Sequence, residues 1–276
     1  MDMVIQVATM PGRDDKPNED YAGALPSSAV LLDGAGGPSE MPTGCSHGTP
    51  WYVRQLGARV LAGMETSPEV GLPDILAAGI GTVSGLHRET CDLSAPGTPA
   101  SVVIMARARG EAFEYLVLGD STIVIDAGEL TVVTDRRIDA VAAEEHKAMM
   151  ALPTGTAEHQ SARIRFVQLQ RELRNKPGGY WTASTDPQAA FEAVTGSVPL
   201  ADVTRAALLS DGVTRFTEFG LGTWGDLLDI LGALGPAELF ARIRDAEAAD
   251  PSGSRWPRAK RRDDVAVVHL AAMRHS

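Results

Sequence analysis

Short apolar runs alternate along the chain with longer stretches in which apolar residues recur every three or four positions. Apolar runs of about four to eight residues that are bounded by glycine or aspartate are typical of buried strands. Such runs lie at residues 3–8, 29–32, 115–118, 206–209 and 265–268. Between residues 100 and 133, short apolar runs separated by Gly110, Gly119 and Gly128 predict an antiparallel meander.

Helical spacing dominates the segments between these runs. Apolar residues repeat at helical intervals in residues 53–64 and 76–86, and again in residues 157–174, 224–234 and 236–247. Residues 38–50 are rich in Gly, Pro, Ser and Thr and are predicted to form a loop. Strands followed by paired helices, without regular β-α-β units, favour a layered α+β fold over a doubly wound sheet.

Composition supports a folded core and excludes some classes of partner. Of the 276 residues, 44% are hydrophobic and 22% are charged, which is enough apolar material for a substantial core. Acidic residues outnumber basic ones 36 to 25, and the formal charge of -11 argues against a general nucleic-acid binder. Cys45 and Cys91 lack the spacing of a metal finger and predict free thiols in a reducing cytoplasm. We find no signal peptide and no apolar stretch that would span a membrane, so we expect a cytoplasmic protein without a membrane partner.

Carboxylates collect where the predicted strands begin or end. A single Asp-Gly pair is an ordinary turn former, but here the pattern recurs at four places, namely Asp33-Gly34, Asp120, Asp211 and Asp263-Asp264. A fifth acidic cluster, Glu19-Asp20, ends the polar loop at residues 11–20. An aspartate at the end of a buried strand is costly to desolvate unless it is paired or bound to a metal. Mg²⁺ and Mn²⁺ prefer such oxygen ligands, and two neighbouring ions activate a water for phosphoryl transfer. The pattern therefore favours metal-dependent hydrolysis.

Five motifs, in this order, resemble those of the metal-dependent protein phosphatases of type 2C, the PPM family. They are Asn18-Glu19-Asp20, residues 32–37 (Leu-Asp-Gly-Ala-Gly-Gly), residues 118–121 (Leu-Gly-Asp-Ser), residues 209–212 (Leu-Ser-Asp-Gly) and residues 262–265 (Arg-Asp-Asp-Val). The resemblance covers nearly the whole chain. It implies a single domain over residues 1–276 with a four-layer α-β-β-α sandwich, in which two antiparallel sheets are flanked by helix pairs. Residues 136–200 depart from the family and form a divergent helical flap region.

The resemblance also implies a role for each carboxylate. Asp33 would bridge two Mg²⁺ or Mn²⁺ ions, and a water between the ions would be the nucleophile. Glu19 and the carbonyl of Gly34 would complete one ion, and Asp211 and Asp263 would bind the other. Asp20 would orient a water or a ligand, and Asp120 would belong to a third metal site. Asp264 stands where the family usually has Asn.

The substrate-binding residues depart from the family pattern. Asp15 occupies the place of an Arg that binds the substrate phosphate in the family, so we expect flanking Arg13 or Lys16 to do so, or another group. Arg13 is favoured because a guanidinium binds phosphate through two hydrogen bonds. A basic cluster over residues 255–262, which includes Arg258, is either a solvated loop or a device that draws anionic substrate towards Asp263.

Three more residues have two interpretations each. Some relatives carry a proton-donating His at the place of Ala35, and His47 is our candidate for that role, the alternative being a loop or capping His. Tyr180 and Trp181 either pack in the core or line a substrate cleft beside Gly178-Gly179.

Three functions are consistent with this sequence. The first is a phosphatase of phosphoserine and phosphothreonine in proteins. The second has the same chemistry on a small phosphorylated metabolite, which the missing Arg and the altered flap would permit. The third is a weakly active relative that binds or regulates a phosphorylated partner.

Overall fold

The apolar runs form two five-stranded antiparallel sheets that lie face to face, in a computed structural model that describes residues 3–272. The first sheet has the order β1 (Met3–Met10), β10 (Val265–Ala272), β9 (Arg205–Leu209), β6 (Thr122–Asp126) and β7 (Leu130–Val133). The second has the order β2 (Tyr21–Leu25), β3 (Ser28–Gly34), β4 (Ser101–Arg109), β5 (Ala112–Leu118) and β8 (Val194–Pro199).

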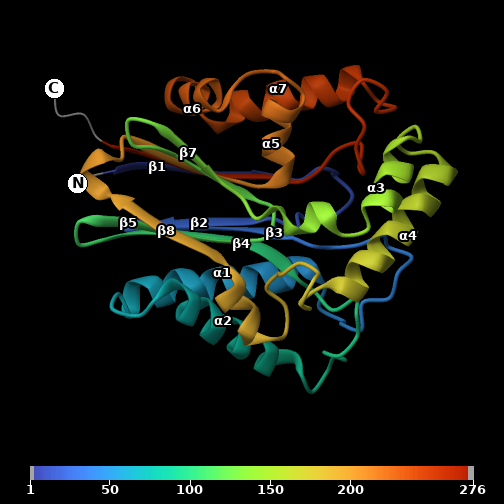
Figure 1. Ribbon diagram of the computed structural model, residues 1–276, viewed down its shortest axis with the longest axis horizontal. Coiled ribbons are helices and arrows are strands. Elements are labelled where there is room, and N and C mark those ends of the chain that lie inside the picture. The colour runs from blue at the N-terminus through green and yellow to red at the C-terminus, as the bar shows by residue number, and fades with distance from the viewer. Residues whose placement is uncertain (1–2, 273–276) are drawn as a thin grey trace.

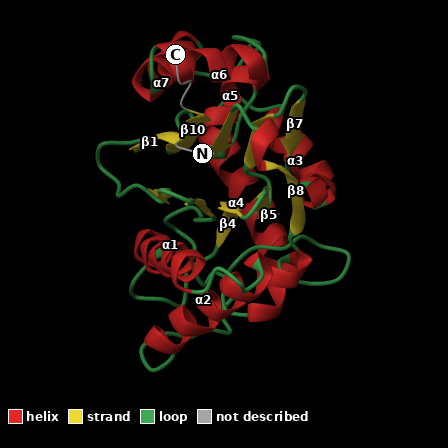
Figure 2. Cartoon of the chain, turned by 90° about the vertical axis from the view of Figure 1, so that its left-hand side faces the viewer, coloured by secondary structure: helices red, strands yellow, loops and turns green. Residues whose placement is uncertain are grey.

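Helices cover the outer face of each sheet (Figure 1). α1 (Thr49–Thr66) and α2 (Leu72–His87) pack on the second sheet. α5 (Asp211–Glu218), α6 (Trp224–Ala233) and α7 (Pro236–Ala249) pack on the first. The layers therefore follow the order helix, sheet, sheet, helix, and the expected α-β-β-α sandwich is confirmed, as a second view also shows (Figure 2).

A helical hairpin lies at one end of the sandwich, beside both sheets (Figure 1). It consists of α3 (Ala143–Met150) and α4 (Ala157–Leu173), and short 3-10 turns at residues 136–140, 187–192 and 200–202 flank it in the chain. The hairpin lies within residues 136–200, for which the sequence predicts a divergent helical flap region. Within residues 3–272, no helix has both the length and the apolar character that crossing a bilayer requires.

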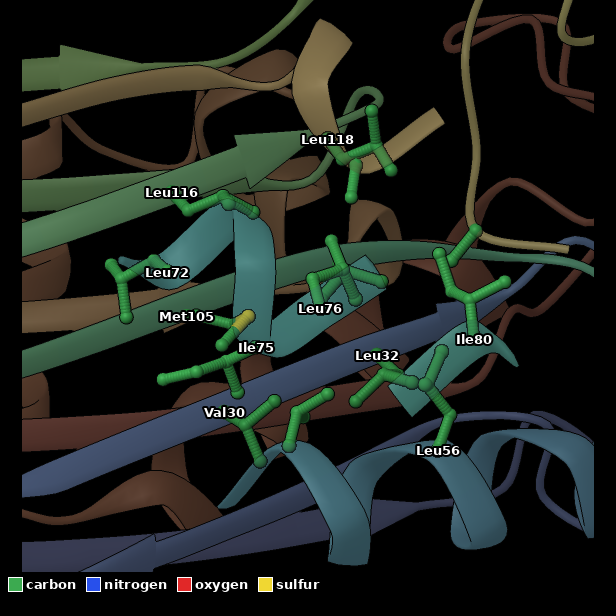
Figure 3. Close-up of a cluster of buried hydrophobic side chains, with 14 of the residues drawn as sticks. Val30, Leu32, Leu56, Leu72, Ile75, Leu76, Ile80, Met105, Leu116 and Leu118 are labelled. Carbon is green, nitrogen blue, oxygen red and sulfur yellow. The ribbon is translucent and has the colours of Figure 1, made fainter. Parts of the chain in front are cut away.

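Strands buried on both faces explain the continuous apolar runs. Along β3, Val30 and Leu32 face α1 and α2, whereas Ala29 and Leu31 face the opposite sheet. The helix-facing core is shown in Figure 3, where Leu56 and Ile80 lie close to Leu32. Successive residues of a strand point to opposite faces, so a strand between two cores must be apolar throughout.

One topological expectation was wrong. Residues 100–133 do not form one meander, because β4 and β5 belong to the second sheet whereas β6 and β7 belong to the first. The chain crosses between the sheets at Gly119, whose φ of 92° is readily adopted by glycine. This crossing leaves Asp120 at the edge where both sheets end, which matters for the site.

Candidate metal centre and substrate cleft

Strand pairing brings the acidic clusters to one edge of the sandwich. In the first sheet, Leu209 is opposite both Val267 and Thr122, so the end of β9 lies beside the starts of β10 and β6. Asp211, Asp263 and Asp120 lie just beyond these strand ends. In the second sheet, β3 ends at the same edge with Asp33 and Gly34. Clusters that are far apart in sequence are therefore neighbours in the fold.

Asp33 connects the two sheets at this edge. Its Oδ2 accepts a hydrogen bond from the backbone N–H of Asp211 at 3.0 Å and one from the hydroxyl of Ser121 at 3.5 Å. Asp211 begins α5, so this N–H belongs to the first turn of a helix and favours a negative charge. A carboxylate from one sheet is thus held against a helix that follows a strand of the other.

Asp264 shapes the loop that carries Glu19. Its two carboxylate oxygens accept hydrogen bonds from the backbone N–H groups of Gly12 and Glu19, both at 2.7 Å. A side-chain amide could offer only one oxygen to these two donors, so the aspartate suits this place. A Cβ on Gly34 or Gly36 would collide with Glu19, which shows how closely the β3 end packs against it.

Asp263 is held by two cations. Arg215 Nη2 lies 3.0 Å from Asp263 Oδ2, and Lys260 Nζ lies 2.6 Å from Oδ1. Burial would raise the pKa of Asp263, but the charges of Lys260 and Arg215 outweigh it and the pKa is lowered. Arg215 is itself buried against Glu247 of α7 at 2.5 Å. Asp263 therefore stays ionised and is fixed by a chain of buried ion pairs.

The other acidic groups are crowded, and within residues 3–272 none of Asp20, Asp33 and Asp120 forms an ion pair. Burial, followed by the charges of Asp263 and Asp120, raises the pKa of Asp33 to about 6. Burial and then the charge of Asp211 raise the pKa of Asp120 to about 7. For Asp20, burial and the charges of Asp33 and Asp211 raise the pKa well above its usual range.

These properties fit divalent cations. Asp20 Oδ2 is buried and has no hydrogen-bond partner among the residues that the structure describes. A bound cation would stabilise these carboxylates, which repel one another. Its positive charge would lower the pKa values that burial and mutual repulsion raise. The donor set consists of oxygen atoms alone, as Mg²⁺ and Mn²⁺ prefer.

A cleft of about 680 Å³ opens beside these carboxylates. It is built from the loop at residues 12–19, Gly36 and Gly37, the start of α4, and the segment 259–264, and it reaches Glu19 and Asp263. Five of its cationic residues are Lys16, Arg163, Lys260, Arg261 and Arg262. The cleft is therefore cationic at its walls and acidic where it meets the metal centre, in a chain whose net charge is strongly negative.

Arg163 is the residue in this cleft that sequence reasoning missed. It lies on α4, and within residues 3–272 its guanidinium forms no ion pair or hydrogen bond, while the charges of Asp263, Glu19 and Glu40 act on it. Burial outweighs these charges and lowers the pKa of Arg163. The sequence showed an arginine-rich helix here, but nothing in it indicated which arginine faces the acidic groups.

The structure changes the expectation for Arg13 and Asp15. Arg13 Nε donates to Asp15 Oδ1 at 2.8 Å, and the two side chains form an exposed ion pair at the rim of the cleft. The negative charge of Asp15 is thereby paired, and the Arg13 guanidinium is engaged in that pair. Lys16 also lines the cleft.

Arg258 does not have the substrate-binding role that the sequence suggested. Its side chain is 4% exposed, its Nη1 lies 3.0 Å from Asp250 Oδ2, and its carbonyl accepts hydrogen bonds from Thr154 at 2.9 Å and contacts His159 Nε2 at 3.2 Å. A guanidinium buried in this way has no free face for a phosphate. Arg258 therefore joins α4 to the loop before Asp263 and has a structural role.

The remaining substrate candidates lie elsewhere. Tyr180 is 6% exposed, and Trp181 packs against the core cluster under α1 and α2. Neither lines the cleft, and both make packing contacts. His47 lies beside Trp51 and Cys91, and it does not line the cleft either. These positions do not support the expected substrate or proton-donor roles.

No family model matches the sequence, and neither does any curated protein. Solved structures do match the fold. A serine/threonine phosphatase of Mycobacterium tuberculosis, PstP/Ppp, superposes with a TM-score of 0.61 at 15% identity, covering 99% of this chain and 100% of that chain.

Two further structures give the same result. The PstP catalytic domain in complex with two manganese ions gives a TM-score of 0.56 at 17% identity, with 98% of each chain covered. The serine/threonine phosphatase Stp1 from Staphylococcus aureus gives 0.56 at 14% identity, covering 98% of this chain and 95% of that chain. The chain has the fold of these bacterial phosphatases.

Proposed function

We propose that the protein is a Mg²⁺- or Mn²⁺-dependent phosphomonoester hydrolase that acts on phosphoserine and phosphothreonine in proteins. The observation that supports this most directly is the meeting of Glu19, Asp33, Asp211 and Asp263 at one edge of the sandwich, beside a cleft with cationic walls. A phosphate ester needs both features, because its dianion must be attracted and the charge that develops during transfer must be stabilised.

The ligand residues in this proposal are Glu19, Asp33, Asp211 and Asp263, with the carbonyl of Gly34 and with Asp120 at a third position. Bound Mg²⁺ or Mn²⁺ would supply an activated water and neutralise charge on the phosphoryl group. The chain fixes the ligands before binding, since Asp33 is held by the N–H of Asp211 and Asp263 by Arg215. Asp20, which is buried and only partly satisfied, is suited to orient a water.

Arg163 is our candidate for the phosphate contact that Asp15 cannot provide. It lines the cleft, and the negative charges of Asp263 and Glu19 act on it. Within residues 3–272 it has no ion-pair partner. A guanidinium offers two parallel N–H donors to a phosphate, which a lysine does not. Lys16 and Arg261 lie on the same cleft and would attract the substrate over a longer range.

A protein substrate is favoured over a small metabolite. The cationic residues of the cleft come from the loop at residues 12–19, from α4 and from residues 259–264, which surround the centre on several sides. Such a surface suits a phosphorylated segment of a protein chain. The solved structures that share this fold are also named as serine/threonine phosphatases. We propose a cytoplasmic location because Cys45 and Cys91 are not joined by a disulfide.

The first test uses purified protein and p-nitrophenyl phosphate, with and without Mn²⁺, beside Asp33→Asn. We expect Mn²⁺-dependent hydrolysis that Asp33→Asn abolishes. If Mn²⁺ produces no hydrolysis in the wild type, the chain is better explained as a binding protein for phosphorylated partners. Hydrolysis that survives in Asp33→Asn would place the chemistry at another site.

The second test concerns substrate class and Arg163. Arg163→Met should raise KM for a phosphoserine peptide about tenfold or more, because a charge-assisted hydrogen bond to phosphate is lost. Arg165→Met is the matched control, since Arg165 lies two residues further along α4 on its exposed side. Equal KM values in the two variants would refute the role of Arg163. Faster turnover of sugar phosphates or nucleotides than of phosphopeptides would favour the metabolite alternative.

A further inference from the structure

Two cysteines and two histidines meet on the α1/α2 side of the fold, away from the carboxylate centre. Cys45 and His47 come from the loop between β3 and α1, His87 ends α2, and Cys91 follows it. The four potential ligand atoms all lie within 4.8 Å of one another. The chain has no other cysteine, so both of its thiols are at this place.

Local structure explains how each pair of ligands is presented. The N–H of Cys91 donates to the carbonyl of His87 at 2.9 Å, which continues the last turn of α2 and places residues four apart on one face. On the other side, Thr43 Oγ1 donates to the carbonyl of Cys45 at 3.0 Å and holds a tight turn.

The two segments are also joined by the backbone. The N–H of Asp92 donates to the carbonyl of Gly44 at 2.8 Å, directly beside Cys91 and Cys45. Gly44 has φ 71°, and a Cβ there would collide with Ala95, so the close approach requires glycine. The four side chains are thus brought together by contacts that need no metal, and the arrangement is preorganised.

The surroundings are aromatic and partly buried. The Trp51 ring lies 4.4 Å from the His47 ring and 5.1 Å from the His87 ring, measured between centroids. His87 is 1% exposed, and within residues 3–272 its Nδ1 lies 3.5 Å from Cys45 Sγ while its Nε2 has no hydrogen-bond partner. A thiol is a weak hydrogen-bonding group, so a buried imidazole is poorly satisfied by it.

We propose that Cys45, His47, His87 and Cys91 form a structural Zn²⁺ site. Zn–S bonds of about 2.3 Å and Zn–N bonds of about 2.0 Å in a tetrahedron separate two sulfurs by about 3.8 Å and a sulfur from a nitrogen by about 3.5 Å. Here Cys45 Sγ and Cys91 Sγ are 3.3 Å apart, and Cys45 Sγ is 3.5 Å from His87 Nδ1. His47 Nδ1 is 3.3 Å from Cys91 Sγ and 3.8 Å from Cys45 Sγ.

The ligand chemistry decides between metals. Two sulfurs and two imidazole nitrogens select Zn²⁺ and disfavour Mg²⁺ and Mn²⁺, which prefer oxygen. Four protein ligands leave no open coordination position, which is the property of a structural site. A disulfide is the competing outcome, but the sulfur separation is well beyond the S–S bond length of about 2.05 Å. This inference does not depend on the proposed phosphatase activity.

The site would fasten together two connections. One runs from Asp33 at the end of β3 to the start of α1, and the other runs from the end of α2 to β4. Each is long and rich in Gly, Pro, Ser and Thr, so a metal that joins them offsets the entropic cost of ordering both. Zinc binding energy would therefore appear as stability of the α1/α2 layer.

The test measures zinc and cobalt, not phosphatase activity. Protein purified under reducing conditions, without chelator, should contain about one zinc per chain by elemental analysis. After replacement of zinc by Co²⁺, a thiolate-to-cobalt charge-transfer band in the near ultraviolet should appear, which an all-oxygen centre cannot give. Cys45→Ser and Cys91→Ser should each lose the zinc and most of this band, whereas Ser46→Ala in the same loop should retain both.

Asp211→Asn separates the two metal sites, because it alters the carboxylate centre and should leave zinc content and the cobalt band unchanged. Circular dichroism of each cysteine variant checks that it folds, and the wild-type cobalt spectrum decides the question without any variant. Less than about 0.1 zinc per chain together with no thiolate band would overturn the proposal. A mass two units lower in the wild type, which shows a Cys45–Cys91 disulfide, would overturn it as well.

Discussion

Asp120 is expected to destabilise the metal-free protein, so its replacement by Asn should increase stability. The residue lies just after the Gly119 turn, at the end where both sheets meet, and burial and the charge of Asp211 raise its pKa. Asn keeps the shape of the side chain and removes the charge. The backbone carbonyl of residue 120, which accepts a hydrogen bond from Thr134 Oγ1 at 3.0 Å, is unaffected.

The magnitude follows from the pKa. It rises from the ordinary value of 3.8 to about 7, and each pKa unit is worth about 1.4 kcal/mol, so the ionised side chain costs up to about 4 kcal/mol above pH 7. Asp120 is partly exposed, and screening by water brings the expected gain from Asp120→Asn to about 2 kcal/mol. Since the folded chain binds more protons than the unfolded chain between pH 4 and 7, the cost grows as the pH rises through this window.

Urea unfolding of the metal-free wild type and Asp120→Asn at pH 8 and pH 5 measures the effect. The variant should be more stable at pH 8, and the difference should shrink at pH 5. Glu129→Gln is the control, because Glu129 is an exposed acid on the neighbouring β6–β7 turn and its removal should change stability by less than about 0.5 kcal/mol. An Asp120→Asn variant that is less stable at pH 8, or equally stabilised at both pH values, would refute the reasoning.

Three further changes have definite expected results. Burial and then the charge of Arg205 lower the pKa of His269 to about 4, so the unfolded chain binds more protons between pH 6.5 and 4 and stability is lost on acidification. His269→Gln should reduce this loss, as read from the urea midpoint at pH 7 and pH 4.5. Glu247→Gln should destabilise the fold by about 3 kcal/mol in thermal unfolding, because buried Arg215 loses one of its two charged partners. In Gly36→Ala, the new methyl group would displace the Glu19 carboxylate, so the Mn²⁺ concentration needed for half-maximal activity should rise while far-ultraviolet circular dichroism stays unchanged.

The parts of the fold that the sequence predicted are those whose burial leaves a periodic signal. Strand β3 is apolar on both faces because it lies between two cores, and α1 repeats its apolar residues at helical intervals because one face packs on β3. Strands β2 and β8 were missed, since they lie at the edges of the second sheet and their residues are mostly half-buried or exposed. The sequence also does not show that the chain changes sheets after β5. A glycine turn such as Gly119 can connect two strands of one hairpin or two strands of different sheets.

The candidate site divides in the same way. Asp33, Asp120, Asp211 and Asp263 were predictable because each follows or precedes a buried strand, where an acidic group is costly unless it is paired or bound to a metal. Glu19 and Asp20 precede the half-buried strand β2 and were assigned from the resemblance. Arg163 and the ion pair between Arg215 and Glu247 were not predictable, because each depends on which face of a helix meets a segment distant in sequence.

The cysteine–histidine cluster was missed for a different reason. Cys45 and His47 lie two residues apart, and His87 and Cys91 lie four apart at a helix end, which is a spacing that places both on one face. The separation of the two cysteines in the sequence does not fit a metal finger. Counting His with Cys would have shown two pairs of potential ligands, although only the fold brings the pairs together.

A single segment, residues 33–48, connects the carboxylate centre to the proposed zinc site. Gly34 and Gly36 at its start pack against Glu19, while Cys45 and His47 near its end lie against Cys91. Thr49, which opens α1, also contacts Gly34, so the two ends of the segment meet through one side chain. A segment held at both ends keeps Glu19 in place at lower entropic cost than one held only at the start.

We therefore expect zinc to increase the affinity of the carboxylate centre for Mn²⁺, although zinc takes no part in the hydrolysis. In Cys45→Ser, the Mn²⁺ concentration that gives half of the maximal rise in melting temperature should increase about fivefold, a coupling of roughly 1 kcal/mol. Linkage requires the reverse effect to be equal, so saturating Mn²⁺ should increase the zinc affinity of the wild type about fivefold. Asp33→Asn weakens Mn²⁺ binding and should remove this increase. Identical Mn²⁺ titrations of wild type and Cys45→Ser would show that the two ends of the segment are independent.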